Sequence, residues 1–555
     1  MFNRIMSGES SVTRPACIQG SFAPMNAWAD ILASTEKEYR RYFTSLADPE
    51  TAQQTQLRAI LHANKNAEWG RRYDFANIRH VADYQSAVPI TGYNDIASSV
   101  QRIAKGGQCV LFEADTLFME KTGGSTGGEK LIPWNQQSLH ALQCGLKPWL
   151  HSLLKSRPGI SRGKSYWSIS PALRRSDPPA ADPSVLPVGI DNDALFFGET
   201  LAKSLQQVLM APAGIATADS FSQWRYMTLK CLLLEENISF ISIWSPVFFS
   251  ELLQWFAVNG QSLVNDIAAD GHSARAQQLA EVRSHTSLDA TVIWPKLDTV
   301  SCWTQGSARH FVAELEQYLP GVYIQGKGLL ATENIVTLPI EGAAAPVLAI
   351  NSGFYEFIDD DGNTLTCCEL AEGKTYEVLM TTWGGLYRYR LGDRVRVSGW
   401  LKKTPLLDFA GRAGLVCDLC GEKLDEAFVC SALASAGNHR AGFSMLLPVM
   451  KPRGYELILD KDQWNHETAG AFANRVEHQL QKNPQYHYAV TIGQLQPLRA
   501  VRVASPWIRY REFMLDKGMR LGDIKPPVLS PHWVLRKYFL PENQDGCDGP
   551  AEANP

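Results

Sequence analysis

Beyond Tyr93 the chain alternates short β-rich runs with amphipathic helical patterns, and this alternation limits the folds that it can adopt. The β-rich runs span Cys109–Phe112, Thr291–Ile293, Val347–Ile350 and Tyr376–Met380. The helical patterns span Ser138–Leu154 and Ala308–Tyr318. Such alternation is typical of α/β architecture. We therefore predict an α/β fold in which helices flank mixed β-sheets.

The ends and the length of the chain suggest how it is divided. Between Trp28 and Asn66 apolar residues recur at helical spacing, and Asp48-Pro49 interrupts them, which predicts two amphipathic helices. The length of 555 residues predicts more than one folding unit. A polar stretch before Phe409–Arg412 suggests a boundary, which gives a large unit over 27–411 and a smaller one over 412–540. Residues 1–26 and 541–555 lack core-forming residues and are expected to be flexible.

Composition excludes several classes of protein. The 53 basic and 57 acidic residues give a formal net charge of -4, which argues against a nucleic-acid-binding protein. The 11 scattered cysteines favour a reducing compartment over a secreted disulfide scaffold. The first 20 residues have no apolar signal segment, and charged residues interrupt the most apolar stretch, Cys231–Val258. We therefore expect a cytoplasmic protein that binds neither nucleic acid nor membrane.

The glycine-rich segment Thr122–Lys130 is the most informative one for function. Four glycines, two hydroxyl side chains and a lysine within nine residues favour a loop that grips a polyphosphate. The segment is not a Walker loop, because no Gly-Lys-Ser/Thr closes it. A flexible surface loop is the plain alternative. Its Gly-x-Ser-x-Gly pattern also leaves open a serine hydrolase that uses Ser125, although a proline follows where a helix would be needed.

Two further patterns invite metal assignments that fail. The acidic segment Asp359–Asn363 does not match a calcium loop in register, and it is better explained as a hairpin turn. Cys417 and Cys420 lack the second pair of ligands that a zinc site needs, so we expect buried strand cysteines there. Adjacent Cys367 and Cys368 are likewise expected on a strand, with one side chain inside and the other outside.

Three motifs in order then resemble those of adenylate-forming enzymes. The loop Thr122–Lys130 resembles their phosphate loop, with Glu129 in place of the usual proline. Leu329–Glu333 resembles their aromatic-x-x-[Ser/Thr]-Glu motif, with leucine replacing the aromatic residue. Tyr387–Asp393 closely matches the Tyr-Arg-Tyr-Arg-x-Gly-Asp motif of the Gretchen-Hagen-three family of auxin-responsive acyl acid amido synthetases and their bacterial relatives. The resemblance extends from about Leu57 to about Pro527 and implies a large N-terminal adenylate-forming domain followed by a smaller, mobile α+β C-terminal domain.

The resemblance implies roles for individual residues. The loop would hold the phosphates of ATP through Gly124, Ser125, Thr126, Gly127 and Lys130. Thr332 would contact the nucleotide, and Glu333 would help to hold Mg²⁺, which prefers oxygen ligands. Asp393 would accept hydrogen bonds from the ribose hydroxyls. The plain alternatives are a solvated loop carboxylate for Glu333 and a turn cap for Asp393. The replacement at Leu329 removes an aromatic face expected beside the adenine.

The C-terminal part also resembles the family. Gly411-Arg412 and the Gly-Glu-Lys element at 421–426 resemble the hinge that opens the mobile domain, so Arg412 is expected near the nucleotide and the pivot. Lys525 resembles the lysine that bridges acyl carboxylate and phosphate. Trp303 and Thr304, and the segment Tyr166–Pro171, are expected near the acid. In the Tyr-Arg-Tyr-Arg motif, strand alternation predicts tyrosines on one face and arginines on the other, with ion pairs at the interface between lobes.

These features together predict an ATP- and Mg²⁺-dependent ligase, with Lys525, Glu333 and Lys130 as candidate catalytic residues. It would convert a carboxylic acid to an acyl-AMP and transfer the acyl group to an amine, most simply an amino acid, to form an amide. Three alternatives stay open from the sequence. They are a ligase that forms thioesters with coenzyme A or a carrier protein, a serine hydrolase built on Ser125, and a nucleotide-binding protein that has lost catalysis.

Overall fold

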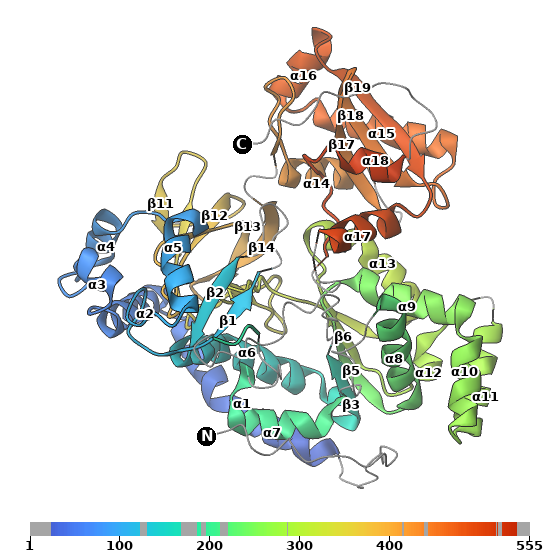
Figure 1. The fold of residues 1–555 in the computed structure, drawn as a ribbon, viewed down its shortest axis with the longest axis horizontal. Helices are drawn as coiled ribbons and strands as arrows, with labels where there is room; N and C mark the ends of the chain where they lie inside the picture. Colours follow the sequence, from blue (N-terminus) through green and yellow to red (C-terminus); the bar gives the residue numbers. More distant parts are fainter. Residues whose placement is uncertain are drawn as a thin grey trace.

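Two sheets of different type form the centre of the larger part of the molecule (Figure 1). The computed structural model describes residues 24–122, 130–167, 186–189, 196–210, 220–285, 287–412, 416–437, 442–517, 519 and 524–540. One sheet is parallel, with the strand order β4-β3-β5-β6-β7. Its strands are β3 (Lys164–Trp167), β4 (Leu209–Met210), β5 (Ile238–Ser242), β6 (Thr299–Cys302) and β7 (Tyr323–Gly326). All the carboxyl ends of these strands therefore lie at one edge.

The other sheet is antiparallel and has the strand order β11-β10-β12-β13-β14-β9-β8. Its strands are β8 (Thr337–Leu338), β9 (Val347–Leu348), β10 (Phe354–Ile358), β11 (Thr364–Thr366), β12 (Thr375–Thr381), β13 (Tyr389–Leu401) and β14 (Thr404–Arg412). The predicted hairpin turn at Asp359–Asn363 is confirmed, because it joins β10 to β11. The mixed α/β prediction is confirmed too.

The two helices predicted before Asn66 are confirmed, although the first begins at Pro24, so residues 24–26 are helical and not flexible as expected. Asp48 caps the second helix by accepting a hydrogen bond from the Thr51 amide at 3.3 Å, and Pro49 occupies the first turn, where its missing N–H costs nothing. The first five helices are α1 (Pro24–Ser45), α2 (Pro49–Ala63), α3 (Glu68–Arg72), α4 (Val81–Ala87) and α5 (Tyr93–Ala104). Tyr42 of α1 anchors this layer by donating to the Leu348 carbonyl at 2.9 Å.

A hairpin and a long helix connect the helical layer to the parallel sheet. The hairpin consists of β1 (Thr116–Lys121) and β2 (Leu131–Asn135), and it frames residues 123–129, which lie outside the described ranges. Asn135 caps helix α6 (Gln136–Ser156) by accepting from the Ser138 amide at 2.8 Å. The predicted helix over 138–154 is thus confirmed.

Most of the remaining helices cover the parallel sheet. They are α7 (Glu199–Val208), α8 (Phe221–Leu234), α9 (Pro246–Asn259), α10 (Gln261–Ala269), α11 (Ser273–Ser284), α12 (Ala290–Ile293) and α13 (Arg309–Tyr318), and 3-10 turns lie at Pro158–Arg162 and Gly306–Ala308. The predicted helix over 308–318 is confirmed. Trp224, Phe249 and Trp294 are fully buried between these helices and the sheet.

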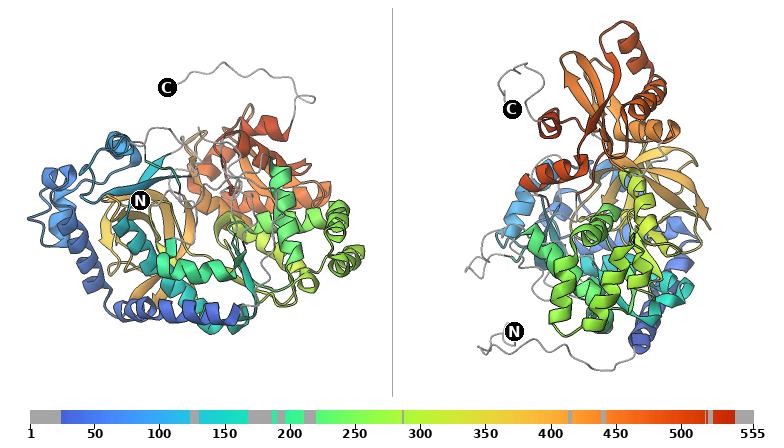
Figure 2. Two further views of the ribbon diagram at one scale, coloured as in Figure 1. Left: turned by 60° about the horizontal axis from the view of Figure 1, so that its bottom comes forward. Right: turned by 90° about the vertical axis from the view of Figure 1, so that its right-hand side faces the viewer.

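The C-terminal elements stand at one end of the molecule (Figure 2). Their strands are β15 (Val416–Cys417), β16 (Leu424–Asp425), β17 (Ser444–Met450), β18 (Arg453–Asp460) and β19 (Gln496–Val503). Their helices are α14 (Glu426–Ser435), α15 (His466–Leu480), α16 (Pro484–Thr491), α17 (Pro506–Asp516) and α18 (Leu535–Phe539). Helix α17 meets the larger part, because Arg511 pairs with Glu251 of α9 at 2.8 Å. Trp507 and Phe311 also pack across this contact, with ring centroids 6.3 Å apart.

Some local predictions are wrong. Cys109–Phe112 is not a strand but an irregular segment, whose buried apolar side chains fill a core between the N-terminal helices and the antiparallel sheet. Thr291–Ile293 is helical within α12, because Asp289 caps this turn by accepting from the Thr291 amide at 2.9 Å. Cys367 and Cys368 occupy a turn rather than a strand, although one is buried and the other exposed as predicted.

The cysteine and arginine predictions are borne out in part. Cys417 is buried on β15, whereas Cys420 lies in a bend and is half-buried. Arg388 and Arg390 do form ion pairs, but both partners belong to the antiparallel sheet and not to an interface between lobes. Arg388 pairs with Glu356 of β10 at 3.2 Å, and Arg390 pairs with Glu377 of β12 at 3.1 Å.

Candidate active site

Asp393 and Arg412 face each other across two neighbouring strands. Asp393 lies on β13 directly opposite Arg412 on β14, and the Arg412 Nε donates to Asp393 Oδ1 at 2.9 Å. Asp393 is buried, so the guanidinium offsets the cost of placing its charge there. The carboxylate in turn raises the pKa of Arg412. Asp393 is therefore not a turn cap, because it belongs to the strand.

Glu333 lies next to this pair. It lies in the turn between Leu330 and Ile335, which form an isolated bridge, and it accepts a hydrogen bond from the Tyr389 hydroxyl at 3.4 Å. Burial raises the pKa of the Glu333 carboxyl, and the charge of Asp393 raises it further. Arg412 and Lys130 act in the opposite direction. All four charged groups thus interact electrostatically in one place.

The predicted phosphate loop is only partly described. Gly124, Ser125, Thr126 and Gly127 lie outside the described residues. Both ends of the loop are fixed, because the Thr122 amide donates to the Lys130 carbonyl at 2.9 Å. The Lys130 ammonium lies 5.5 Å from the centre of the Tyr93 ring, and the Tyr93 hydroxyl accepts from the Leu131 amide at 3.0 Å. The hairpin therefore brings Lys130, at the end of the loop, close enough to Glu333 to act on its charge.

The motif that carries Glu333 runs back into the antiparallel sheet. Thr332 is half-buried, as its neighbour Glu333 is. Leu329, which replaces the expected aromatic residue, packs against the core beneath the sheet, and its amide donates to the Thr337 hydroxyl at 2.8 Å. The backbone of this motif is therefore held at both ends, at Leu329 and at the Leu330–Ile335 bridge.

A second group of side chains gathers at the carboxyl edge of the parallel sheet. Trp303 and Thr304 follow β6, and the Trp303 amide donates to the Trp244 carbonyl at 2.8 Å after β5. The centres of the Trp244 and Trp303 indole rings lie 5.7 Å apart. A side chain at Gly326, at the end of β7, would collide with the Thr304 hydroxyl, so glycine is required for this close approach. The segment Tyr166–Pro171 is described only to Trp167, at the same edge.

Lys525 reaches this edge from the C-terminal part of the chain. Its ammonium lies 3.6 Å from the centre of the Trp303 ring, a cation–π geometry. The Tyr510 hydroxyl of α17 donates to the Lys525 carbonyl at 3.3 Å and thereby steadies the segment. The structure thus brings the predicted lysine and the predicted tryptophan together, although 222 residues separate them in sequence.

Lys327, which belongs to the same edge, was not predicted from the sequence. Its ammonium donates to the Ser242 hydroxyl at 2.8 Å and lies 5.2 Å from the centre of the Trp244 ring. Burial lowers its pKa from the ordinary value to about 8. The one hint in the sequence is the position of Lys327, directly after β7 and just before the Leu329–Glu333 motif.

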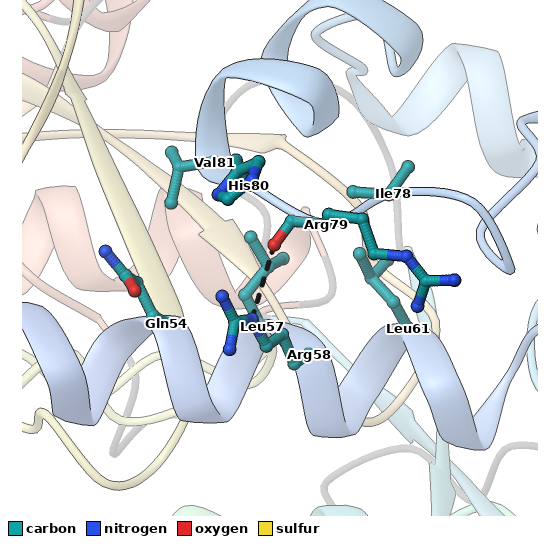
Figure 3. A pocket seen from close by; sticks show the side chains of 8 residues that line it. All are labelled: Gln54, Leu57, Arg58, Leu61, Ile78, Arg79, His80 and Val81. Carbon is teal, nitrogen blue, oxygen red and sulfur yellow. Dashed lines mark hydrogen bonds between the residues drawn. The ribbon is translucent and has the colours of Figure 1, made fainter.

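No metal cluster marks the site in the part of the chain that the structure describes. No group of three or more His, Cys, Asp or Glu side chains in these residues is arranged to hold a metal ion. A small hollow lies elsewhere, between α2 and the segment before α4 (Figure 3). The Arg58 Nε there donates to the Arg79 carbonyl at 3.3 Å, and none of the site residues lines this hollow.

Comparison with solved structures identifies the fold. The chain superposes on the GH3.15 acyl acid amido synthetase with a TM-score of 0.76 at 21% identity, covering 92% of this chain and 95% of that one. The same enzyme in complex with 2,4-DB gives a TM-score of 0.79, and the match covers 94% of this chain and 97% of that one. A 2-hydroxyisobutyryl-CoA ligase in the postadenylation state gives a TM-score of 0.54 at 12% identity. The match covers 88% of this chain and 90% of the ligase. The fold is that of the adenylate-forming enzymes.

Sequence comparison identifies the family. Residues 40–324 match the GH3 family N-terminal domain, 346–412 the central domain and 423–532 the C-terminal domain. Indole-3-acetic acid-amido synthetase GH3.4 of Arabidopsis thaliana is 24% identical over 430 residues, covering 70% of this chain and 71% of that protein. Indole-3-acetic acid-amido synthetase GH3.8 of Oryza sativa subsp. indica is 25% identical over 575 residues, covering 89% of this chain and 91% of that protein. This chain belongs to the GH3 family.

Among the helices in the described ranges, none combines the length and the apolar composition that crossing a bilayer requires.

Proposed function

We propose that this protein is an ATP-dependent acyl acid amido synthetase. In the first step a carboxylate oxygen of the acid attacks the α-phosphorus of ATP; the new acyl–phosphate bond forms while the bond to pyrophosphate breaks. In the second step an amine nitrogen attacks the acyl carbon, AMP leaves and the amine loses a proton. The single observation that carries the proposal is the shared location of Glu333, Asp393, Arg412 and Lys130 beside the framed loop.

The charges at the site suit the first step. The carboxylate and the α-phosphate are both negative, so cations must reduce their repulsion. Lys130 would offset the charge of the outer phosphates from the end of the loop, together with Ser125, Thr126, Gly124 and Gly127. Asp393, held by Arg412, would orient the ribose, and Thr332 would contact the nucleotide.

The donor set also fits Mg²⁺, which binds with nucleotides through one or two carboxylates, phosphate oxygens and water. Glu333 would supply the protein ligand, since Asp393 is engaged by Arg412. The ion, when bound, would reduce negative charge on the phosphates. The hydrogen bond from Tyr389 would orient the Glu333 carboxylate toward it.

The second step requires access for the acceptor, and the C-terminal part supplies a means. We propose that residues 412–540 rotate about Arg412 between the two steps, as a mobile domain. Lys525, close to Trp303 in this arrangement, would bridge the acid carboxylate and the α-phosphate during adenylation. Withdrawal of Lys525 would then leave room for the amine.

Family membership favours an amine over a thiol as the acceptor. The relatives named above are described as amido synthetases, and an amino acid is therefore the proposed acceptor here. The ligase that forms thioesters shares only the fold. The hydrolase alternative gains no support, because it has no feature in its favour beyond the short pattern around Ser125.

The test is pyrophosphate release from ATP and Mg²⁺ with a panel of aryl, indolyl, fatty and amino acids, with hydroxylamine present to trap acyl adenylates as hydroxamates. Acid-dependent release with a matching hydroxamate is expected. Replacing hydroxylamine by amino acids, and separately by coenzyme A, identifies the acceptor by the product formed. Failure to bind ATP would overturn the proposal.

A further inference from the structure

Lys327 is a half-buried cation at the carboxyl edge of the parallel sheet, in the place where open α/β sheets bind ligands. Its contacts come from β5, the segment after β5 and α6. The ammonium donates to Ser242 at the end of β5, and it lies 5.2 Å from the ring centre of Trp244 after β5 and 5.5 Å from that of Trp149 on α6. Trp149 is itself fixed, since its Nε1 donates to Gln325 at 2.9 Å.

The described surroundings of Lys327 contain a hydroxyl and aromatic faces but no ion pair with a carboxylate. Other buried or half-buried cations of this chain do have such partners, including Arg388 with Glu356 and Arg511 with Glu251. Burial without a counter-ion disfavours a charged amine, and the low pKa of Lys327 reflects this cost. An uncompensated lysine of this kind is costly for stability alone, because methionine would fill the same space more cheaply.

The location of Lys327 relative to Lys525 indicates what would compensate it. Lys525 lies over Trp303 and Lys327 lies over Trp244, and these two indole rings contact each other at 5.7 Å. Two cations from different parts of the chain therefore border the same pair of aromatic rings. Under the proposed function, the carboxylate to be activated lies at Lys525, which leaves Lys327 for another group of the same molecule.

We propose that Lys327 binds a second anionic group of the acyl substrate, so that the natural acid is a dianion with an apolar spacer. The indole rings would contact the spacer, and the ammonium would donate a charge-assisted hydrogen bond to the distal anion. The assignment of the substrate rests on the proposed function, whereas anion binding by Lys327 does not.

The test compares acids matched in length, benzoate with terephthalate and hexanoate with adipate. In the absence of ATP, the dicarboxylates should raise the thermal midpoint of the protein more than the monocarboxylates do. Lys327→Met should abolish this difference. With ATP, Mg²⁺ and hydroxylamine, kcat/KM for hydroxamate formation should favour the dicarboxylate, and Lys327→Met should lower that value by roughly 10- to 100-fold. Hydroxylamine removes the amino acid acceptor from the assay.

Two further variants sharpen the outcome. Lys164→Met removes a lysine from the opposite edge of the same sheet, where it pairs with Glu235, and should leave the preference unchanged. Lys327→Arg keeps the charge and should retain part of the preference. Equal stabilisation by mono- and dicarboxylates overturns the proposal even if monocarboxylates are adenylated. Lys327-dependent binding of dicarboxylates without any hydroxamate supports anion binding by Lys327 and counts against the proposed function instead.

Discussion

Arg412 holds the Asp393 carboxylate in one orientation, and the effect of changing that carboxylate is therefore predictable. Asp393→Asn keeps the shape but weakens both the ion pair and the hydrogen bonds proposed to the ribose. We expect ATP to bind roughly 10- to 100-fold more weakly, since a hydrogen bond to a charged group contributes about 1.5–3 kcal/mol. Titration calorimetry with ATP measures the change.

The matched control for Asp393→Asn is Glu377→Gln, which removes a carboxylate from an ion pair in the same sheet, with Arg390. ATP affinity should not change in that variant. An Asp393→Asn protein that folds and binds ATP as tightly as the parent would contradict the role of Asp393.

Glu333 differs from Asp393 because Arg412 and Lys130 offset only part of the cost of burying its carboxylate. Burial raises its pKa, so at pH 7 its negative charge disfavours the folded state, and Glu333→Gln should leave the thermal midpoint unchanged or higher. Adenylation should nonetheless slow by about 100-fold, the usual effect of losing one electrostatic contact in a transition state. A melting curve measures the effect on stability, and pyrophosphate release measures the effect on adenylation. Loss of stability together with activity would indicate a structural role for Glu333.

The pKa of Lys327, about 8, predicts how substrate preference depends on pH. The ammonium is present below that pH and is lost as the pH rises through it. In the ratio kcat/KM, which reports on the free enzyme, the advantage of a dicarboxylate over a monocarboxylate should therefore fall above about pH 8. The nearby thiol of Cys302 has a pKa raised by burial to about 12 and does not titrate in this range. Pyrophosphate release from pH 6.5 to about 9.5 tests this, and a constant preference would contradict it.

The sequence predicted many of these residues but not how they meet. Asp393 and Arg412 belong to separate motifs, and only the register of β13 with β14 pairs them. Strand register depends on which faces are buried, which a single sequence leaves open. Lys327 was missed because a lone lysine after a strand has no motif of its own, and its importance comes from tryptophans distant in the chain.

At the scale of elements, long periodic helices were predicted well and short apolar runs were not. Helices α1, α2 and α6 are long enough for their apolar spacing to be unambiguous. The run Thr291–Ile293 is rich in β-branched residues, yet the cap from Asp289 starts a helical turn there. Local capping outweighed strand propensity, which depends strongly on context.

The contact between α17 and α9 should favour the arrangement in which adenylation occurs. Arg511 and Glu251 are mostly buried, with side chains 12% and 20% exposed. Arg511→Met should destabilise the contact by about 1–2 kcal/mol and slow acyl adenylate formation by about 5- to 30-fold. Aminolysis of a supplied acyl adenylate should proceed at the parental rate. Lys230→Met, which breaks the pair with Asp270 at 2.7 Å, should alter neither step. Equal slowing of both steps by Arg511→Met would contradict this prediction.

At the scale of the whole molecule, one core crosses between the C-terminal part and the parallel sheet. Phe443, Tyr510 and Phe513 belong to the same buried cluster as Phe249 and Trp294. A second C-terminal core, around Phe472 and Tyr486, is separate from it. Rotation of residues 412–540 would therefore have to expose part of the first core while it preserves the second. The sequence suggested a boundary near Arg412 but could not predict this shared core, because its members are far apart in the chain.

The closeness of Lys525 to Trp303 also has an optical consequence. An indole has a larger dipole in its excited state than in its ground state, so a full charge 3.6 Å from the ring centre shifts its emission. If the C-terminal part withdraws after adenylation, Trp303 loses that charge and its fluorescence must change. The chain has 15 tryptophans, and subtracting the signal of a Trp303→Phe protein removes the contribution of the others. The chain thus contains its own spectroscopic reporter, through which each turnover could be followed in real time without any attached dye.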